Sequence, residues 1–549
     1  MASNERYVGS QADIKVQRSR FPLRRRTIMS YFHGMFHPVG APIEVLPGDT
    51  MKAVISCFTR MSPPIVPFID NVRQEVDFWF VPKRILWNKT KQFYGESPSF
   101  GIATAVEEPH KPMNIALSDL ATNFAKSESI AGSLGLVMDE FISGYTNYPQ
   151  INVLPIRALL AVWNENYRDE NYQDQYSWDK DQTGSITNLA FINGSAIGLS
   201  ASLPKVNKDR DVFTTILPYQ IKGSPVALTI GGKIPVIADS VVHDAGNIYL
   251  SHTNGTSVNS PLYTKSGYVH VDPSGTAPSG TQNVKYTNLV ADLGAAAQAS
   301  ISDLLYSLAY QDFLARAAHY GTRYREYIYS MFGTQIPDAS EDVPEYLGRL
   351  KFNINVQQVV QTTGFDPSAS SELGQLGAYS NSGKSDAVFT KSFVEPGYIV
   401  IVTYTKHQRT YTSGLDRVWL KTELLDYYQP PFANIADIPI GSFDIWTNNK
   451  DAETPLGFQE PWYEYRFLHD RAYGLMNAAR DTLGQLWTLA DVYASKPTIG
   501  AQFMEEDRNA IARVLTTGSN GPDYMMDFQL DIDATRVMPL FPRGTLKGF

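Results

Sequence analysis

Residues 524–533, which read YMMDFQLDID, carry an apolar side chain at every second position. A period of two is typical of a β-strand that buries one face. The intervening positions are mostly acidic or amide side chains, as expected for a face that meets water. The stretch therefore predicts a half-buried antiparallel strand, with these residues directed inward: Tyr524, Met526, Phe528, Leu530 and Ile532.

Two earlier stretches repeat this alternation. Residues 72–80 (VRQEVDFWF) and 350–357 (LKFNINVQ) each place their apolar side chains on one side of a ribbon. In the first of them, Arg73, Glu75 and Asp77 fall on the opposite side. Further strands are predicted at 43–46, 51–58 and 398–402, where β-branched and aromatic residues are enriched.

These strands are scattered along the chain, and the stretches between them are much longer than ordinary connections. This spacing favours one pair of sheets with long excursions over a string of small domains, and no repeat of fixed period suggests a propeller or solenoid. Helices are a minority. One is predicted from about Ser300 to Gly321, and another within 151–168, starting at Pro155.

The composition is that of a globular chain: 549 residues, 43% hydrophobic and 19% charged. The single cysteine, Cys57, excludes disulfide frameworks and cysteine-based zinc clusters. No secretion signal or membrane-spanning run is expected, because no stretch of about 18 apolar residues occurs. The 31 tyrosines are more than a core requires and are typical of extensive packed interfaces.

The first 26 residues are basic although the whole chain has a net charge of −9. They hold seven Arg and Lys residues against two acidic ones. The triplet Arg24-Arg25-Arg26 has two interpretations: a solvated or ion-paired face, or a contact to the phosphates of a polyanion. For the second interpretation, the candidate DNA-binding residues are Arg18, Arg20, Arg24, Arg25 and Arg26.

Residues 224–298 differ from the rest in the opposite way. They contain seven charged residues in 75 positions, and Gly, Ser, Thr and Asn fill the remaining space. This composition predicts an exposed, turn-rich insertion with short strands.

No motif demands catalysis. A phosphate-binding loop and a serine-hydrolase elbow are absent from the sequence, and no catalytic residue or cofactor is assigned. His33 and His37 have the i, i+4 spacing of helical metal ligands, but Gly34 and Pro38 disfavour a helix and no third ligand stands nearby. We therefore assign no metal site.

Seven sequence blocks follow one another along the chain: EVLPGDT (44–50), FWFVPKRILW (78–87), LPIR (154–157), DVFTTILPYQIKG (211–223), GTRYRE (321–326), SFVEPGYI (392–399) and FQEPWYEYR (458–466). In this order they resemble the major capsid proteins of microviruses, small tailless phages with circular single-stranded DNA, in their gokushovirus-like branch. The chain departs from that pattern at Val212, at Pro396 and at Arg349, where the family has a second glycine after Gly348.

The resemblance implies a mainly β fold, a single viral jelly roll: an eight-stranded antiparallel β-sandwich with long loop insertions and a few helices. Residues 1–40 would be a basic arm, 41–223 and 299–549 the two parts of the jelly roll, and 224–298 a surface insertion that protrudes at the threefold axes. Within that insertion, residues that would meet the host are His243, His252, Asn254, Tyr263 and His270.

The implied function is structural and not enzymatic. Copies of the chain would form a T=1 icosahedral shell around single-stranded DNA, be assembled in the bacterial cytoplasm and reside in the virion, with no membrane insertion. The implied partners are a DNA pilot protein, an internal scaffolding protein and a bacterial surface receptor.

Two other classes of protein are alternatives. A carbohydrate-active jelly-roll enzyme would need a signal peptide and a carboxylate pair in a cleft, and no signal peptide is found. A nucleic-acid-binding module acting alone is disfavoured by the net charge of −9.

Overall fold

The computed structural model divides into two compact units, Ile221–His319 and the remainder of the chain, which are described separately. The residues it describes are 17–97, 105–113, 128–136, 148–224, 236–238, 249–252, 257–265, 268–271, 284–286, 289–291, 301–360, 376–433, 436–447, 455–479 and 482–541.

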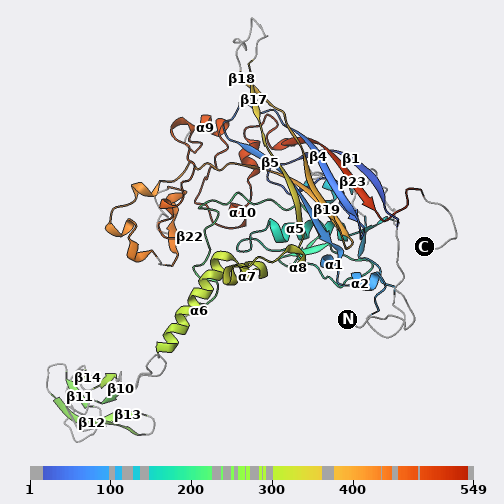
Figure 1. Cartoon of the computed structure of the whole chain (residues 1–549). Coiled ribbons are helices and arrows are strands. Elements are labelled where there is room, and N and C mark those ends of the chain that lie inside the picture. Colours follow the sequence, from blue (N-terminus) through green and yellow to red (C-terminus); the bar gives the residue numbers. More distant parts are fainter. Residues whose placement is uncertain are drawn as a thin grey trace. The chain divides into compact units, whose positions relative to one another are not determined.

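The first sheet of the larger unit has four antiparallel strands in the order β1-β23-β4-β19 (Figure 1). Strands β4 and β23 alternate between buried and more exposed residues along most of their length, as the period of two predicts. The strands are β1 (Ser19–Tyr31), β4 (Thr50–Met61), β19 (Ser382–Ser392) and β23 (Tyr524–Arg536).

The second sheet has the order β16-β5-β20-β2, and β3 also pairs with β20. Because β2 and β3 pair with successive parts of β20, they fill one strand position together. The strands are β2 (His37–Pro38), β3 (Ile43–Val45), β5 (Val72–Pro82), β16 (Glu345–Ile354) and β20 (Gly397–His407).

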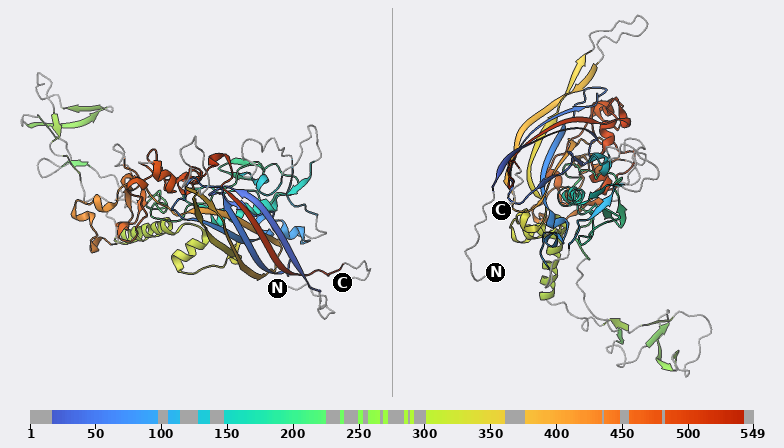
Figure 2. Two further views of the ribbon diagram at one scale, coloured as in Figure 1. Left: turned by 90° about the horizontal axis from the view of Figure 1, so that it is seen from above. Right: turned by 90° about the vertical axis from the view of Figure 1, so that its right-hand side faces the viewer.

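Counted along the chain, with β2 and β3 as one position, β1, β4, β19 and β23 are the first, third, sixth and eighth strands and form one sheet. The second, fourth, fifth and seventh positions, which are β2 with β3, β5, β16 and β20, form the other. This alternation between two sheets is the pattern of a jelly roll, so the predicted fold class is confirmed. In Figure 2 the long strands lie along one side of this unit, and most of its loops and short helices lie along the other.

The two sheets enclose one hydrophobic core, to which all three alternating stretches contribute. The inward residues predicted from the sequence are buried or partly buried there, which confirms the strands and their facing. Its members include Ile55, Val72, Val76, Phe78, Phe80, Leu350, Ile354, Tyr524, Met526, Phe528, Leu530 and Ile532.

Strand β5 is buried on both faces, so the expectation of a half-buried strand is wrong there. A second core, built around helix α5 (Leu154–Asn166), covers the outer face of the second sheet. Glu75 and Asp77, on that face, are at most 3% exposed. The prediction fails because the covering helix lies far from β5 in the sequence.

The two buried carboxylates share the guanidinium of Arg349, and Glu75 also lies 2.6 Å from Arg73. Arg349 forms a two-bond fork on Asp77, at 2.6 and 2.9 Å, and lies 2.7 Å from Glu75. The Tyr404 hydroxyl lies 2.8 Å from Glu75 and 2.9 Å from Asp77, so its one proton can be donated to either carboxylate. Burial alone would raise the pKa of Glu75, but the hydrogen bond from Tyr404 and the charge of Arg349 outweigh it and lower that pKa.

The long insertions follow β5 and β20. Before β16 come α1 (Lys83–Leu86), α2 (Thr90–Phe93), β6 (His110–Pro112), α4 (Ile130–Ser133), β7 (Gln150–Asn152), α5, β8 (Ala190–Ile192), β9 (Ser195–Ile197), α7 (Tyr324–Phe332) and α8 (Asp338–Glu341). Between β16 and β19 lie β17 (Val356–Val360) and β18 (Leu376–Ser380). Between β20 and β23 lie η2 (Arg417–Trp419), η3 (Leu424–Asp426), η4 (Pro430–Phe432), β21 (Ile438–Gly441), η5 (Ser442–Asp444), β22 (Pro455–Gln459), η6 (Tyr463–Tyr465), η7 (Gly474–Met476), α9 (Thr482–Trp487), α10 (Ala501–Met504), α11 (Arg508–Ala512) and η8 (Gly518–Asn520).

The smaller unit contains short antiparallel strands and nearly all of helix α6 (Ile301–Tyr320). Both predicted helices are confirmed: α5 has Pro155 in its first turn, and Gly321, at φ +93°, follows α6. The strands are β10 (Val236–Ala238), β11 (Tyr249–His252), β12 (Ser257–Lys265), β13 (Tyr268–Val271), β14 (Val284–Tyr286) and β15 (Leu289–Ala291).

Replacing the shared cation should destabilise the sandwich. We expect Arg349→Leu to lower the free energy of unfolding by about 3 kcal/mol at pH 7, because two buried carboxylates lose a common partner. The pKa of Glu75 is lower in the folded chain than in the unfolded chain, where it is about 4.3. The stabilisation that depends on ionised Glu75 is therefore complete above about pH 4.3 and is lost as the pH falls through the pKa of the folded chain. The difference between the proteins should therefore shrink below about pH 4.

Urea unfolding at several pH values measures this difference. Arg349→Lys is the matched control, since it keeps a cation without the planar fork and should give an intermediate loss. An equal loss of unfolding free energy at pH 3 and pH 7 would contradict the role of Arg349 as the partner of ionised carboxylates.

Candidate functional site

The insertion between β20 and β23 exposes many large apolar side chains. Trp419 is 75% exposed and Leu468 is 96% exposed. We call this set the apolar loop surface: Leu415, Val418, Trp419, Leu420, Leu424, Leu425, Tyr427, Tyr428, Phe432, Tyr465, Phe467, Leu468, Tyr473 and Leu475. Monomeric soluble proteins rarely expose large apolar areas, so a concentration of this kind marks a surface that meets another molecule.

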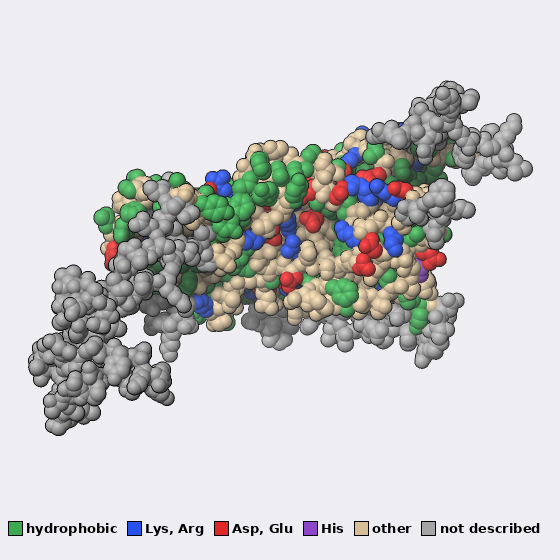
Figure 3. Space-filling model, turned by 90° about the horizontal axis from the view of Figure 1, so that it is seen from below, with side chains coloured by type: hydrophobic (Ala, Val, Ile, Leu, Met, Phe, Trp, Pro, Cys, Tyr) green, Lys and Arg blue, Asp and Glu red, His purple; other side chains and the backbone are tan. Residues whose placement is uncertain are grey.

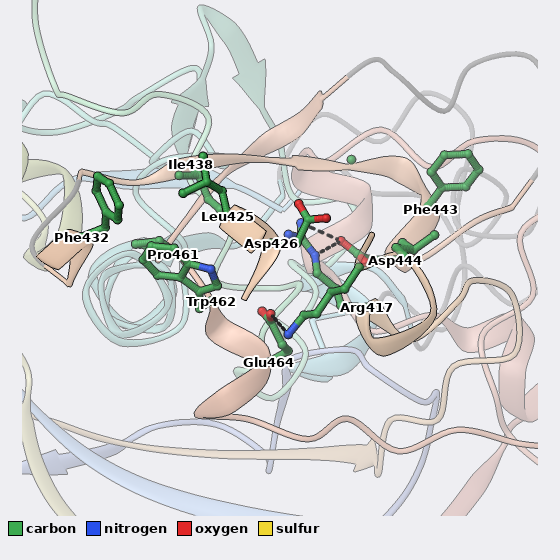
Figure 4. Close-up of a pocket in the computed structure, with 13 residues that line it drawn as sticks. Arg417, Leu425, Asp426, Phe432, Ile438, Phe443, Asp444, Pro461, Trp462 and Glu464 are labelled. Carbon is green, nitrogen blue, oxygen red and sulfur yellow. Dashed lines mark hydrogen bonds and ion pairs between the residues drawn. The ribbon is translucent and has the colours of Figure 1, made fainter. Parts of the chain in front are cut away.

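Part of the apolar loop surface is hollowed into a pocket of about 380 Å³ (Figure 4). Leu425, Phe432, Ile438 and Trp462 form its apolar wall. Trp462 has φ +52°, a left-handed conformation that costs a non-glycine residue free energy and that clusters at functional positions.

Four of the five charged side chains at this pocket form ion pairs. Arg417 lies 3.2 Å from Asp444, and Lys421 lies 2.7 Å from Glu464. The fifth, Asp426, accepts from the backbone amides of Thr422 and Glu423, each at 2.8 Å. The pocket therefore offers an apolar wall beside charges that are paired or hydrogen-bonded, which suits an apolar or aromatic group of a partner.

Other exposed apolar residues lie on α6 and α7. On α6, Leu305 is 62% and Tyr306 is 71% exposed. On α7 the exposed side chains are Tyr324, Tyr327, Tyr329 and Phe332. The high tyrosine count of the sequence is thus explained in part by surface residues.

Residues 19–31, which the sequence assigns to the basic arm, form strand β1. Arg20, Arg24 and Arg26 lie on its outward face, opposite or diagonal to aspartates of β23. The ion pairs are Arg20–Asp533 at 2.5 Å, Arg24–Asp531 at 3.5 Å and Arg26–Asp527 at 2.5 Å. The hydrogen bond from Arg26 lowers the pKa of Asp527.

The three ion pairs form an Arg–Asp ladder between β1 and β23. The two other candidate arginines are not part of this ladder. Arg25 lies on the opposite side of β1 and donates to the carbonyls of Val39 and Ala41, at 3.1 and 2.7 Å. Arg18 precedes the strand and is exposed. On the face drawn in Figure 3, basic and acidic side chains lie next to one another, and hydrophobic side chains gather in patches.

Three of the five residues predicted for host contact lie in strands of the smaller unit: His252 in β11, Tyr263 in β12 and His270 in β13. Tyr263 and His270 are directly opposite in the β12–β13 register. His243 and Asn254 lie outside the described residues.

A jelly roll whose loops expose many large apolar side chains indicates a protein that associates with other molecules. Among the described residues, no helix has the length and apolar character needed to cross a membrane. The chain belongs to the family described as capsid protein (F protein), whose model matches residues 10–546.

Curated relatives agree with this assignment. The chain is 28% identical to capsid protein VP1 of Chlamydia phage 1, over 91% of this chain and 90% of the relative. It is also 28% identical to capsid protein VP1 of Spiroplasma virus 4, over 97% and 96% of the two chains. Capsid protein VP1 of Bdellovibrio phage phiMH2K is 28% identical over 92% and 91%.

The resemblance to microvirus capsid proteins is therefore confirmed. The chain is a capsid protein of a microvirus-type phage, a structural component of an oligomeric shell and of the virion, and not an enzyme.

The sequence did not identify the apolar loop surface, although a signal for it is present. Within 415–475 the aromatic residues are dense, and PWYEYR (461–466) is one of the family blocks. Aromatic residues within a predicted loop indicate an interface rather than a core, because loops run over the surface.

A charge placed on the apolar loop surface should prevent assembly without unfolding the subunit. Leu425 is 62% exposed and lines the pocket, so Leu425→Asp should change the stability of the isolated chain by no more than about 0.5 kcal/mol. Within a shell it should cost about 2 kcal/mol or more at each contact.

Thermal unfolding of the isolated chain and sedimentation of the assembled material test this expectation. Leu425→Met is the control, and it should assemble normally because it keeps apolar volume. Normal shells formed by Leu425→Asp would show that this surface is not between subunits.

Proposed function

We propose that copies of this chain close into a T=1 icosahedral shell that encloses circular single-stranded DNA, and that residues 224–298 form a protrusion at the threefold axes for attachment to the host. The observation that carries the proposal is the apolar loop surface, which needs a covering molecule. In a closed shell of one kind of chain, other copies supply that cover.

The geometry of closure supports a small shell. A single jelly roll presents its loops at the ends and sides of a rigid sandwich, so several different loop surfaces can meet copies around different symmetry axes. The exposed apolar residues of η2, η3 and α7 lie on separate segments of the larger unit. Electron microscopy of purified material tests the proposal, which requires uniform particles with icosahedral symmetry.

The proposed contact with DNA involves Arg18, Arg20, Arg24, Arg25 and Arg26. The exposed ladder arginines use some of their five donors on aspartates, and the remaining N–H groups face solvent. Phosphates would compete with Asp527, Asp531 and Asp533 for these donors. The ladder arginines would thus bind either aspartates or phosphates, and the two interpretations describe two states of the same side chains.

This competition predicts opposite effects of two triple variants on binding to single-stranded DNA. Replacing Arg20, Arg24 and Arg26 with Gln should weaken binding and lower the slope of log K against log salt by about 0.7 for each phosphate that is no longer bound. Replacing Asp527, Asp531 and Asp533 with Asn should strengthen binding, because the arginines are released.

Fluorescence anisotropy with a fluorescent single-stranded oligonucleotide over a range of salt concentrations measures both effects. Lys91→Gln, on α2, is the control for removal of a surface charge. If both triple variants keep the wild-type slope of log K against log salt, β1 is not part of the DNA interface.

The proposal includes further partners and a place of assembly. A DNA pilot protein and an internal scaffolding protein would act during assembly in the bacterial cytoplasm, and a bacterial surface receptor would bind the insertion. The support for a separable insertion is that Ile221–His319 forms a compact unit of its own. Within it, the strands carrying His252, Tyr263 and His270 belong to one small sheet.

Removal of the insertion should separate attachment from assembly. We expect a chain with residues 224–298 replaced by a short Gly-Ser linker to form particles that do not bind bacteria to which wild-type particles adsorb. Electron microscopy and adsorption counts on a panel of bacteria provide the two measurements. Wild-type adsorption by the shortened particles would place the receptor-binding surface elsewhere.

A further inference from the structure

Two histidines and one glutamate from distant segments meet inside the larger unit. His33 follows β1, His407 is the last residue of β20, and Glu506 lies between α10 and α11. All three side chains are 0% exposed. The expectation of no metal site considered His33 with His37, but the structure directs His33 to these other partners, and His37 accepts a hydrogen bond from the Phe32 amide.

The donor atoms of the three residues form a small triangle. His33 Nε2 lies 3.1 Å from Glu506 Oε1 and 3.2 Å from His407 Nδ1, and His407 Nδ1 lies 2.6 Å from Glu506 Oε1. Ligand bonds of about 2.0–2.1 Å around a tetrahedral zinc ion place neighbouring donor atoms about 3.3 Å apart. Two sides of the triangle, at 3.1 and 3.2 Å, match this spacing, and the third, at 2.6 Å, would lengthen by about 0.7 Å around such an ion.

The surroundings orient the imidazole of His33 for metal binding. Its Nδ1 lies 3.0 Å from Thr405 Oγ1 and 3.2 Å from the Tyr524 hydroxyl. A proton held on Nδ1 by these oxygens leaves the Nε2 lone pair directed at the triangle.

The carboxylate is likewise held in place. Glu506 Oε2 accepts from Arg409 at 2.6 Å, and Oε1 accepts from the His407 backbone amide at 2.9 Å. Arg409 also pairs with Asp491, at 2.6 Å, so its charge is shared between two carboxylates.

Hydrogen bonds alone leave the triangle poorly satisfied. If both facing ring nitrogens carry protons, Glu506 Oε1 must accept from both rings and from the backbone amide, with the two ring nitrogens only 3.2 Å apart. If His33 Nε2 is unprotonated, its lone pair faces a carboxylate oxygen at 3.1 Å. A cation at the centre removes both conflicts, because all three donors then present lone pairs to it.

We propose that His33, His407 and Glu506 bind a divalent transition metal ion, with zinc the best match to two imidazoles and one carboxylate. The ion fastens the end of β1, the end of β20 and the loop before α11 to one another. Because binding requires the folded arrangement, the metal stabilises the folded chain by mass action.

Metal titration of the full-length chain tests the proposal. After dialysis against a chelator, we expect calorimetry to detect one Zn²⁺ per chain, and a Co²⁺ titration to give a visible absorption band that saturates at one equivalent. The melting temperature should rise on addition of Zn²⁺. These measurements need no variant, and the absence of stoichiometric binding would overturn the proposal.

Variants then locate the site. His33→Gln and His407→Gln should each weaken Zn²⁺ binding by about 100-fold or more and abolish the Co²⁺ band. His110→Gln, a partly buried histidine outside the triangle, should keep both. Equal Zn²⁺ affinity in wild type and His407→Gln would mean that the ion binds elsewhere, which also overturns the proposal.

Discussion

The pairing of β23 with both β1 and β4 is the interaction on which the rest of the structure depends. It joins residues 524–536 to residues 19–31 and 50–61, so the first sheet exists only when segments about 500 residues apart meet. Contacts of this separation are costly in chain entropy, and they are compensated by the shared core between the sheets. The intervening insertions can then be long, because their ends are fixed by strands.

The second sheet links this sandwich to the loops. Its inner face packs on the first sheet, and its outer face packs on α5, with Glu75, Asp77 and Arg349 buried or partly buried at the junction. The fork of Arg349 on Asp77 and its ion pair with Glu75 stabilise this junction. The loops that carry the apolar loop surface thus extend from a body with little freedom to adjust, and complementary copies must fit it as it stands.

Much of the fold could be predicted from the sequence because its signals are local. The alternation in 524–533 and 350–357 predicts strands, and Pro155 and Gly321 mark the ends of helices. Each of these signals acts over a few residues, and the structure confirms the elements they predict. The contacts across the chain could not be predicted in this way. Local spacing contains no signal for the pairing of the β1 arginines with β23 or for the contact between His33 and Glu506, since the partners are more than 470 residues apart.

The central position of β23 also bears on how incomplete chains behave. A nascent polypeptide that has not yet released residues 524–536 from the ribosome leaves the facing edges of β1 and β4 without their partner and opens the interior of the sandwich to water. Translation must therefore finish before a subunit acquires its rigid body. Fragments that end before residue 524 lack the strand that joins β1 to β4, and therefore lack that body.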